Sequence, residues 1–118
     1  MNQWICLIIL VFLITSWPVL AENADELSAQ GNLLYDNDQY EEALVILDQA
    51  LVLDPENLEA LNGKGKTLKS LGRYEEAIEQ YDKAIAIDPG YSKAWNNKGN
   101  ALTYLKRYDE AEEMFNEA

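Results

Sequence analysis

An internal repeat of 34 residues is the feature of this sequence that most constrains its fold. Residues 58–91 match residues 24–57 before them and residues 92–118 after them. The second and third blocks are identical at 12 of 27 positions, and the first and second blocks at 11 of 34. Unrelated sequences of ordinary composition would agree at roughly one position in seventeen. The chain is therefore expected to fold as a row of similar units that pack on one another.

Apolar residues recur at helical spacing within each block and divide it into two helices. The first helix carries an apolar residue, a glycine and a leucine at intervals of four and three, which places the three on one face. The trios are Leu27, Gly31 and Leu34; Leu61, Gly65 and Leu68; and Trp95, Gly99 and Leu102. This spacing predicts first helices over about residues 25–36, 59–70 and 93–104.

A tyrosine followed by two acidic residues marks the start of the second helix, because acidic side chains complement the positive end of a helix dipole. We expect breaks at residues 37–38, 71–72 and 105–106, and second helices that open at Tyr40, Tyr74 and Tyr108. Asp-Pro pairs at 54–55 and 88–89 end the second helices of the first two blocks, since proline disfavours helix at the residue before it.

Small residues at matching positions predict how the two helices of a block pack. Glycine in the middle of a helix costs about 1 kcal/mol relative to alanine, so three glycines at a fixed period need a packing reason. Each lies 12 residues before an alanine, and we expect the pairs to meet across the hairpin: Gly31 with Ala43, Gly65 with Ala77, Gly99 with Ala111. Larger apolar residues on the repeating stripe are expected in the core: Leu27, Tyr40, Tyr74, Tyr81, Trp95, Tyr108 and Phe115.

The period, the glycine-bearing first helix, the Tyr-Glu-Glu-Ala helix start and the Asp-Pro ending together resemble the tetratricopeptide repeat (TPR) family. The resemblance implies an all-α fold, an α-α superhelix of antiparallel helix hairpins. It implies about three repeats, at 24–57, 58–91 and 92–118, the last incomplete. It also implies a concave groove, lined by the first helix of each repeat, that binds an extended peptide or a partner's helix. We therefore expect a non-enzymatic protein–protein interaction scaffold.

The first 21 residues are predicted to be a signal peptide. An unbroken apolar run from Ile5 to Ile14 is followed by Pro18, and Val19 and Ala21 supply the small residues at which a signal peptidase cuts. This predicts an exported protein that is secreted, periplasmic or held on the outer face of a membrane. No lysine or arginine precedes the apolar run, so an uncleaved N-terminal anchor is the alternative and the one expected route to a membrane.

Composition excludes several classes of site. The sequence has no histidine, and its one cysteine is Cys6, so Cys/His zinc sites and Ser-His-Asp triads are excluded. We expect no catalytic residue, no bound metal and no cofactor. The net charge of -12 at pH 7 would repel a phosphate backbone, so we expect no nucleic-acid partner.

The expected groove carries asparagines and lysines. Asparagine amides can donate to or accept from a peptide backbone, and the lysines favour an acidic peptide or a C-terminal carboxylate. The predicted partner-binding residues are Asn62, Lys66, Lys69, Lys93, Asn96, Asn97 and Asn100. Family members that clamp a chaperone's C-terminal carboxylate use two asparagines, two lysines and an arginine. Here Asn32 and Lys93 match, whereas Ser28, Gly63 and Asn97 stand at the other three positions.

An alternative reading concerns the third block, which reaches only Ala118. Stacked repeats need a polar outer face at the end of the stack, and this block is expected to leave apolar surface exposed around Met114 and Phe115. The chain is then the N-terminal part of a longer repeat array, or a module that self-associates through residues 107–118, without a ligand groove of its own.

Overall fold

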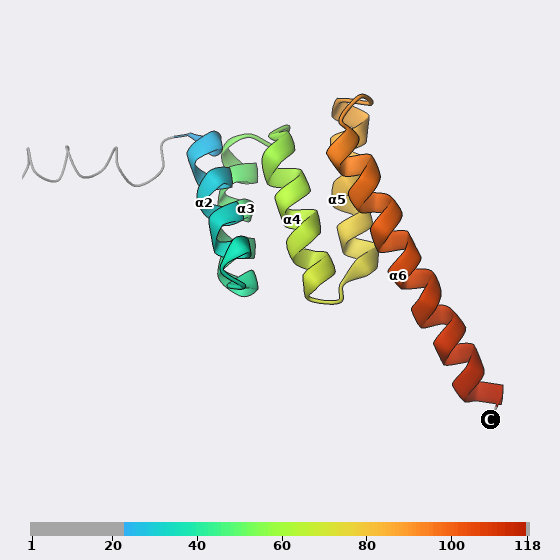
Figure 1. Cartoon of the computed structure of the whole chain (residues 1–118). Coiled ribbons are helices and arrows are strands. Elements are labelled where there is room, and N and C mark those ends of the chain that lie inside the picture. The colour runs from blue at the N-terminus through green and yellow to red at the C-terminus, as the bar shows by residue number, and fades with distance from the viewer. Residues whose placement is uncertain (1–22, 118) are drawn as a thin grey trace, which may run out of the picture.

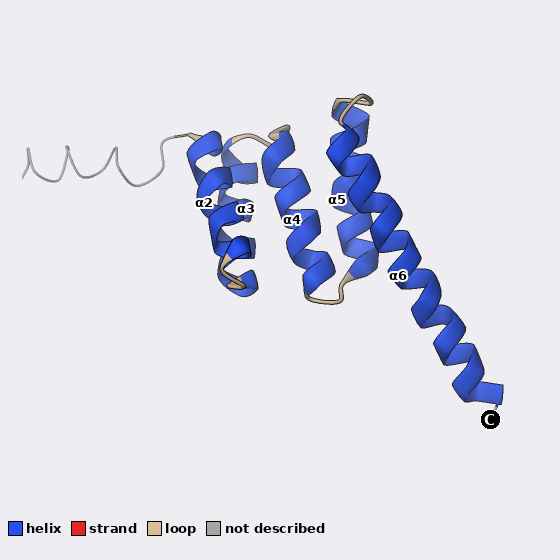
Figure 2. Ribbon diagram, in the orientation of Figure 1, coloured by secondary structure: helices blue, strands red, loops and turns tan. Residues whose placement is uncertain are grey.

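The computed structural model describes residues 23–117, which form five helices and contain no strand (Figures 1 and 2). The helices are α2 (Ala24–Asp36), α3 (Tyr40–Leu53), α4 (Leu58–Ser70), α5 (Tyr74–Ile87) and α6 (Ser92–Glu117). The predicted all-α fold is confirmed. The predicted signal peptide, residues 1–21, lies outside the described residues. Within the described range, no helix is both long enough and apolar enough to cross a bilayer.

The first two blocks each form an antiparallel hairpin, α2 with α3 and α4 with α5, and the hairpins lie side by side (Figure 1). Helices α3 and α5 begin and end where the sequence predicts. Asparagine caps start the first helix of each hairpin. Asn23 Oδ1 accepts a hydrogen bond from the backbone N–H of Glu26 at 2.7 Å, and Asn57 Oδ1 from that of Ala60 at 2.9 Å. Each cap satisfies a backbone donor that has no partner inside its helix.

Both hairpins turn at a residue with positive φ, which is 61° at Asp38 and 78° at Gly72. The N–H of the following residue donates to a backbone oxygen five residues earlier, at 2.9 Å in both turns. This left-handed residue with its backward hydrogen bond is a Schellman motif, which ends a helix and turns the chain. The two turns are therefore built in the same way from different residues.

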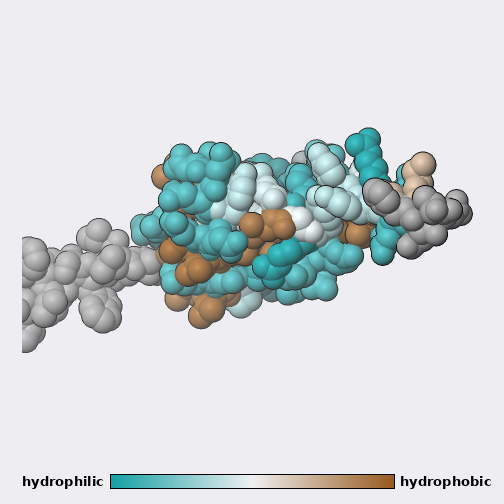
Figure 3. Space-filling model, turned by 90° about the horizontal axis from the view of Figure 1, so that it is seen from below, coloured by the Kyte–Doolittle hydropathy of each residue, from teal (hydrophilic) through white to brown (hydrophobic). Residues whose placement is uncertain are grey.

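Two clusters of buried side chains hold the hairpins together. The first joins α2, α3 and the start of α4 through Ala24, Leu27, Ala43, Leu47, Ala50 and Ala60. The second joins α4, α5 and the first half of α6 through Leu61, Leu68, Ala77, Tyr81, Ala84, Ala94 and Ala101. Each cluster reaches into the following block, so the core is continuous along the row. Outside it, the surface seen from below is mostly hydrophilic, with a few apolar patches (Figure 3).

The mid-helix glycines make room for a bulky side chain of the partner helix. A Cβ on Gly31 would collide with the side chain of Leu47, and a Cβ on Gly65 would collide with the ring of Tyr81. The atoms nearest to each of these Cβ positions belong to the residue 16 positions later, and the pairing of each glycine with the alanine 12 positions later stays a prediction. The alanines twelve residues on are themselves completely buried.

The third block does not form a hairpin. Helix α6 continues through residues 105–106, where a break was predicted, and through Tyr108, where a second helix was predicted to open. Its second half extends away from the two hairpins (Figure 1). The prediction of a third hairpin is therefore wrong for this structure.

The residue at the third turn position explains this difference. Lys106 stands where the closed hairpins have Asp38 and Gly72. Lysine is a good helix former, and a side chain of its size reaches positive φ only at a cost of roughly 1–2 kcal/mol. Nothing at this position stops the helix, so it continues. As a result Gly99, the third mid-helix glycine, has no described atom within 4 Å of its Cβ position.

The absence of a third hairpin also determines which of the expected core residues are buried. Leu27 and Tyr81 are buried as predicted, and the tyrosines that open α3 and α5 are half-buried. Trp95 is 51% exposed and Tyr108 is 62% exposed, so their assignment to the core is wrong. Both belong to the block whose hairpin is open. The side chain of Phe115 lies outside what the structure describes.

Candidate functional site

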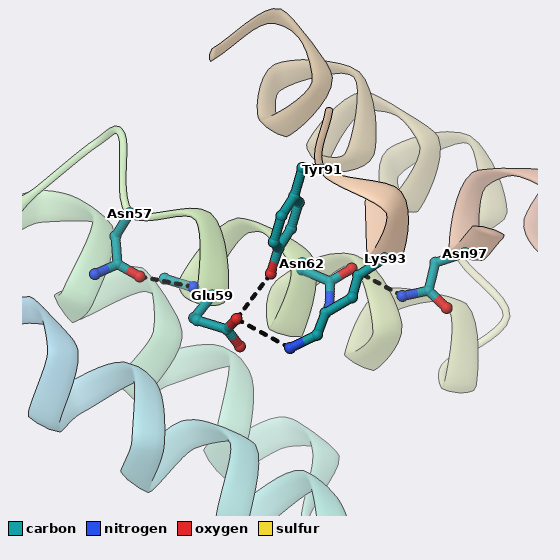
Figure 4. Close-up of polar contacts among 7 residues, drawn as sticks. Asn57, Glu59, Asn62, Tyr91, Lys93 and Asn97 are labelled. Carbon is teal, nitrogen blue, oxygen red and sulfur yellow. Dashed lines mark hydrogen bonds and ion pairs between the residues drawn. The ribbon is translucent and has the colours of Figure 1, made fainter. Parts of the chain in front are cut away.

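A polar hollow of about 300 Å³ opens among α2, α4 and α6, the first helices of the three blocks. Its walls carry amides, lysines and one carboxylate: Asn32 from α2; Glu59, Asn62 and Lys66 from α4; Lys93, Asn96 and Asn97 from α6. Figure 4 shows several of these side chains pointing toward one another. Hydrogen-bonding and charged groups of both signs therefore converge in one place.

Glu59 bridges α4 to the segment that enters α6. One of its carboxylate oxygens accepts hydrogen bonds from the Tyr91 hydroxyl at 2.9 Å and from Lys93 Nζ at 3.2 Å (Figure 4). Burial opposes ionisation and is the largest single influence, but the two hydrogen bonds and the charges of Lys93 and, more weakly, Lys66 outweigh it, so the pKa of Glu59 is lowered. Burial first, then this hydrogen bond, raises the pKa of Tyr91. Glu59 is an anion at neutral pH, and Lys93 is half of an ion pair.

The asparagines of the hollow differ in whether their amides have hydrogen-bond partners. Asn97 Nδ2 donates to Asn62 Oδ1 at 2.8 Å, which links α6 to α4 (Figure 4). Asn32 Oδ1 is buried and finds no hydrogen-bond partner among residues 23–117. The Asn32 amide lies against Gly63, where a Cβ would leave no room for it. A buried acceptor without a donor is costly, and this one lies between α2 and α4, where glycine at position 63 leaves the room that the amide occupies.

Lys66 is the cation best placed to serve a ligand. Its Nζ lies 4.5 Å from the ring centroid of Tyr35 on α2, within the range of a cation–π contact. The ion pairs formed within the described part of the chain involve Lys64, Arg73, Lys93 and Lys98, and none of them involves Lys66. A ring face leaves most of the ammonium charge available, whereas a carboxylate would neutralise it.

The structure brings five of the seven predicted binding residues to this hollow: Asn62, Lys66, Lys93, Asn96 and Asn97. Lys69 and Asn100 do not line it. Whether any of the seven contacts a partner stays a prediction.

The seven predicted binding residues leave out two residues of the hollow, Asn32 and Glu59, although both lie on the first helices that were expected to line the groove and Asn32 matches the family's carboxylate clamp. A signal for Glu59 was available in the repeat. Asn57 donates to Asp25 at 2.8 Å at the junction of the first two blocks. The residues 34 positions later are Tyr91 and Glu59, which make the corresponding contact. Aligning the blocks for polar pairs across junctions would have found Glu59.

Comparison with known proteins agrees with this architecture. Family models described as tetratricopeptide repeat match residues 28–92 and residues 68–118. No curated protein matches the chain. The second TPR domain of Spaghetti (RPAP3), solved bound to the HSP90 peptide SRMEEVD, has a TM-score of 0.69 and 27% identity, over 80% of this chain and 88% of that one.

Two further solved structures are similar. The TPR domain of Sgt2 from Aspergillus fumigatus has a TM-score of 0.69 and 31% identity, over 79% of this chain and 62% of that one. The Arabidopsis OM64 TPR domain has a TM-score of 0.67 and 26% identity, over 75% of this chain and 73% of that one. With a family model matched over more than half of its length and the same helical architecture, this chain belongs to the tetratricopeptide repeat family.

Proposed function

We propose that this protein is a non-enzymatic interaction scaffold whose hollow among α2, α4 and α6 binds an extended acidic segment of another protein. The TPR fold is a protein–protein interaction module, and a solved relative holds the peptide SRMEEVD, in which three of the last four residues are acidic. The observation that carries the proposal is the position of Lys66, which faces the hollow beside an aromatic ring with no carboxylate paired to it among the described residues.

The net charge of -12 does not prevent an acidic ligand from binding here. Charges farther away than about 8 Å are largely screened at physiological ionic strength, so the ligand responds mainly to the side chains that line the hollow. Those side chains include Lys66 and Lys93 against one carboxylate, Glu59. A ligand carboxylate can bind Lys66 directly and share Lys93 with Glu59.

The amides of the hollow suit a peptide backbone. The Asn62–Asn97 pair would offer its remaining donors and acceptors to a backbone, and Asn96 adds a further amide to the lining. Ser28, Gly63 and Asn97 replace three residues of the carboxylate clamp known in the family. The proposal therefore commits to acidic side chains as the principal contacts and treats a terminal carboxylate as a further contribution.

Fluorescence anisotropy with dye-labelled SRMEEVD as the probe tests this function. We expect the full chain to bind it, an amidated form to bind somewhat less tightly, and a form with Gln and Asn in place of its acids to lose most of the affinity. Lys66→Gln should weaken binding about tenfold, since one charge-assisted contact contributes roughly 1.4 kcal/mol. Lys64→Gln is the matched control, because Lys64 pairs with Asp48 outside the hollow.

Two results would overturn the proposal. One is equal affinity for the acidic and neutralised peptides, and the other is equal loss of affinity in the Lys66 and Lys64 variants. A steep decrease of affinity with salt would support it, because exposed charge contacts are screened.

We also propose that residues 1–21 direct export. The apolar run and the small residues before Glu22 support this. Mass spectrometry of the protein from the cell envelope or medium should find Glu22 as the first residue, whereas an intact N-terminus there would indicate an anchor.

A further inference from the structure

The first half of α6 carries an open packing face. In the first two blocks, the face with the mid-helix glycine packs on the second helix of the hairpin. In the third block the same face consists of Trp95, Gly99 and Leu102. Trp95 and Leu102 are 51% and 46% exposed, and no described atom approaches the Cβ position of Gly99 within 4 Å. We call these three residues the acceptor face.

The second half of α6 carries the sequence that such a face binds. Residues 108–117 align with the start of α5, and Tyr108 and Ala111 correspond to Tyr74 and Ala77. Ala77 is completely buried against α4, whereas Ala111 is exposed. We call residues 108–117 the donor segment. Because α6 is one continuous helix, the donor segment cannot fold back onto the acceptor face of its own chain.

The two halves of α6 have opposite charge. Residues 92–107 contain four basic residues and no acidic one: Lys93, Lys98, Lys106 and Arg107. The donor segment contains five acidic residues and no basic one: Asp109, Glu110, Glu112, Glu113 and Glu117. Lys93 and Lys98 already pair with Glu59 and Asp82, so Lys106 and Arg107 are the cations of this half that remain to attract an acidic helix laid antiparallel beside it.

We propose that a second copy of this chain covers the acceptor face, with its donor segment packed antiparallel on Trp95, Gly99 and Leu102. This contact between two copies would have the same form as the contact between α4 and α5 within a single chain. The register follows from the closed hairpins, where each glycine meets the residue 16 positions later, so Gly99 of one copy lies opposite position 115 of the other.

The geometry of α6 also determines the kind of assembly. At about 100° per residue, Tyr108 and Ala111 lie on roughly the opposite side of α6 from the acceptor face. Two copies therefore cannot bind each other through both surfaces at once, because the two surfaces point in opposite directions from a straight helix. Each copy binds one neighbour through its acceptor face and another through its donor segment, which is a heterologous, head-to-tail contact.

Two substitutions separate the two surfaces. Gly99→Leu fills the acceptor face, and it is tolerated within one chain because the space beyond Gly99 is open. Ala111→Gln enlarges the donor segment at a position that is exposed within one chain. Asn100→Leu is the control, since it adds the same apolar side chain at the neighbouring exposed position, away from the acceptor face.

Sedimentation velocity and native mass spectrometry of the full chain test the proposal. The average mass of the wild type and of Asn100→Leu should rise with protein concentration, whereas Gly99→Leu alone and Ala111→Gln alone should not show this rise. Isotope-labelled Gly99→Leu mixed with unlabelled Ala111→Gln should give a one-to-one pair, because one copy keeps its donor segment and the other its acceptor face. Circular dichroism checks that both variants remain helical.

A wild type whose mass is independent of concentration would overturn the proposal. So would Gly99→Leu that associates like the wild type, or a mixture of the two variants that yields no mixed pair. Association of the variants into pairs of their own would also overturn it, because it would indicate a different contact. If Gly99→Leu fails to fold, capture of wild type by a synthetic peptide of residues 106–117, lost when Ala111 in the peptide is replaced by Gln, provides the same test.

Discussion

The two closed hairpins and the straight α6 are made from the same repeat, yet they differ in how much of it they bury. In residues 24–87 the mid-helix glycine meets a bulky side chain and the chain turns twice through a left-handed residue. In residues 92–117 the same glycine faces open space and the turn is absent. The comparison teaches that the apolar stripe makes the helices, whereas a single turn position decides whether two helices become a hairpin.

The largest expected effect comes from filling the glycine of a closed hairpin. Gly65→Ala should lower the free energy of unfolding by about 1–3 kcal/mol, because its Cβ would collide with the rigid ring of Tyr81. Gly99→Ala should instead stabilise α6 by up to about 1 kcal/mol, since it gains helix propensity and meets nothing within its own chain. Urea unfolding at low protein concentration measures both. Equal effects at the two positions would contradict the distinction between closed and open blocks.

The second prediction restores a turn residue to the open block. Lys106→Gly should shorten α6 and let residues 108–117 fold back, because glycine reaches positive φ at no steric cost and weakens a helix interior by about 1 kcal/mol. The chain should become more compact in X-ray scattering and should lose any concentration-dependent association. Lys106→Ala is the control that keeps the helix. A Gly variant with the wild-type scattering profile would show that the turn position alone does not decide closure.

The repeat predicted the helices well because their signals are local. The period, the Tyr-Glu-Glu starts and the Asp-Pro ends placed α3 and α5 at their observed bounds. The third hairpin was mispredicted because the break at 105–106 was expected from repeat identities such as Tyr108, whereas the residue at the turn itself, Lys106, differs from Asp38 and Gly72. Conservation of a helix start within the repeat does not imply that the helix before it ends.

The site was predictable to the extent that its side chains follow helix faces. Spacing alone placed Asn62, Lys66 and Asn97 on the first helices, and the structure brings them to one hollow. Spacing could not show that Lys93 is held by Glu59, because the two residues are 34 positions apart and meet only when the blocks stack. The packing between repeats therefore determines which lysine is ion-paired within the chain and which can pair with a ligand.

A smaller effect is expected at the position where the two closed hairpins differ. Leu47 and Tyr81 fill the same place in their hairpins, but the Tyr81 hydroxyl is buried with no hydrogen-bond partner among residues 23–117. Burial raises the pKa of Tyr81, so its contribution to stability is present below the ordinary tyrosine pKa near 10 and is lost as the pH rises above it.

Tyr81→Phe should therefore leave stability at neutral pH unchanged or raise it by up to about 1 kcal/mol, and should move alkaline unfolding to higher pH. Chemical unfolding at neutral pH and near pH 10.5 measures both effects. Tyr108→Phe, at an exposed position, is the control and should change neither. A clear loss of stability in Tyr81→Phe would mean that the hydroxyl has a partner in solution.

The smallest effect concerns the two junctions between blocks. Asp25 with Asn57 joins the first pair of blocks, and Glu59 with Tyr91 and Lys93 joins the second. The pKa of Glu59 is lowered, so its stabilising contribution is present above the ordinary value near 4.5 and is lost as the pH falls through the lower, folded value. The Glu59 side chain is 52% exposed, which limits the ion pair to less than about 1 kcal/mol.

Glu59→Gln should therefore cost a few tenths of a kcal/mol at neutral pH, and this cost should shrink as the pH falls below the ordinary value and the carboxylate becomes protonated. Lys93→Gln should cost a similar amount, and the double variant no more than either single one, because all three remove the same ion pair. Hydrogen exchange of the α6 amides, compared with those of α2, locates the loss at the second junction. Equal loss at the two junctions would show that Glu59 does not hold α6 to α4, and that the apolar contacts of Ala94 and Ala101 suffice.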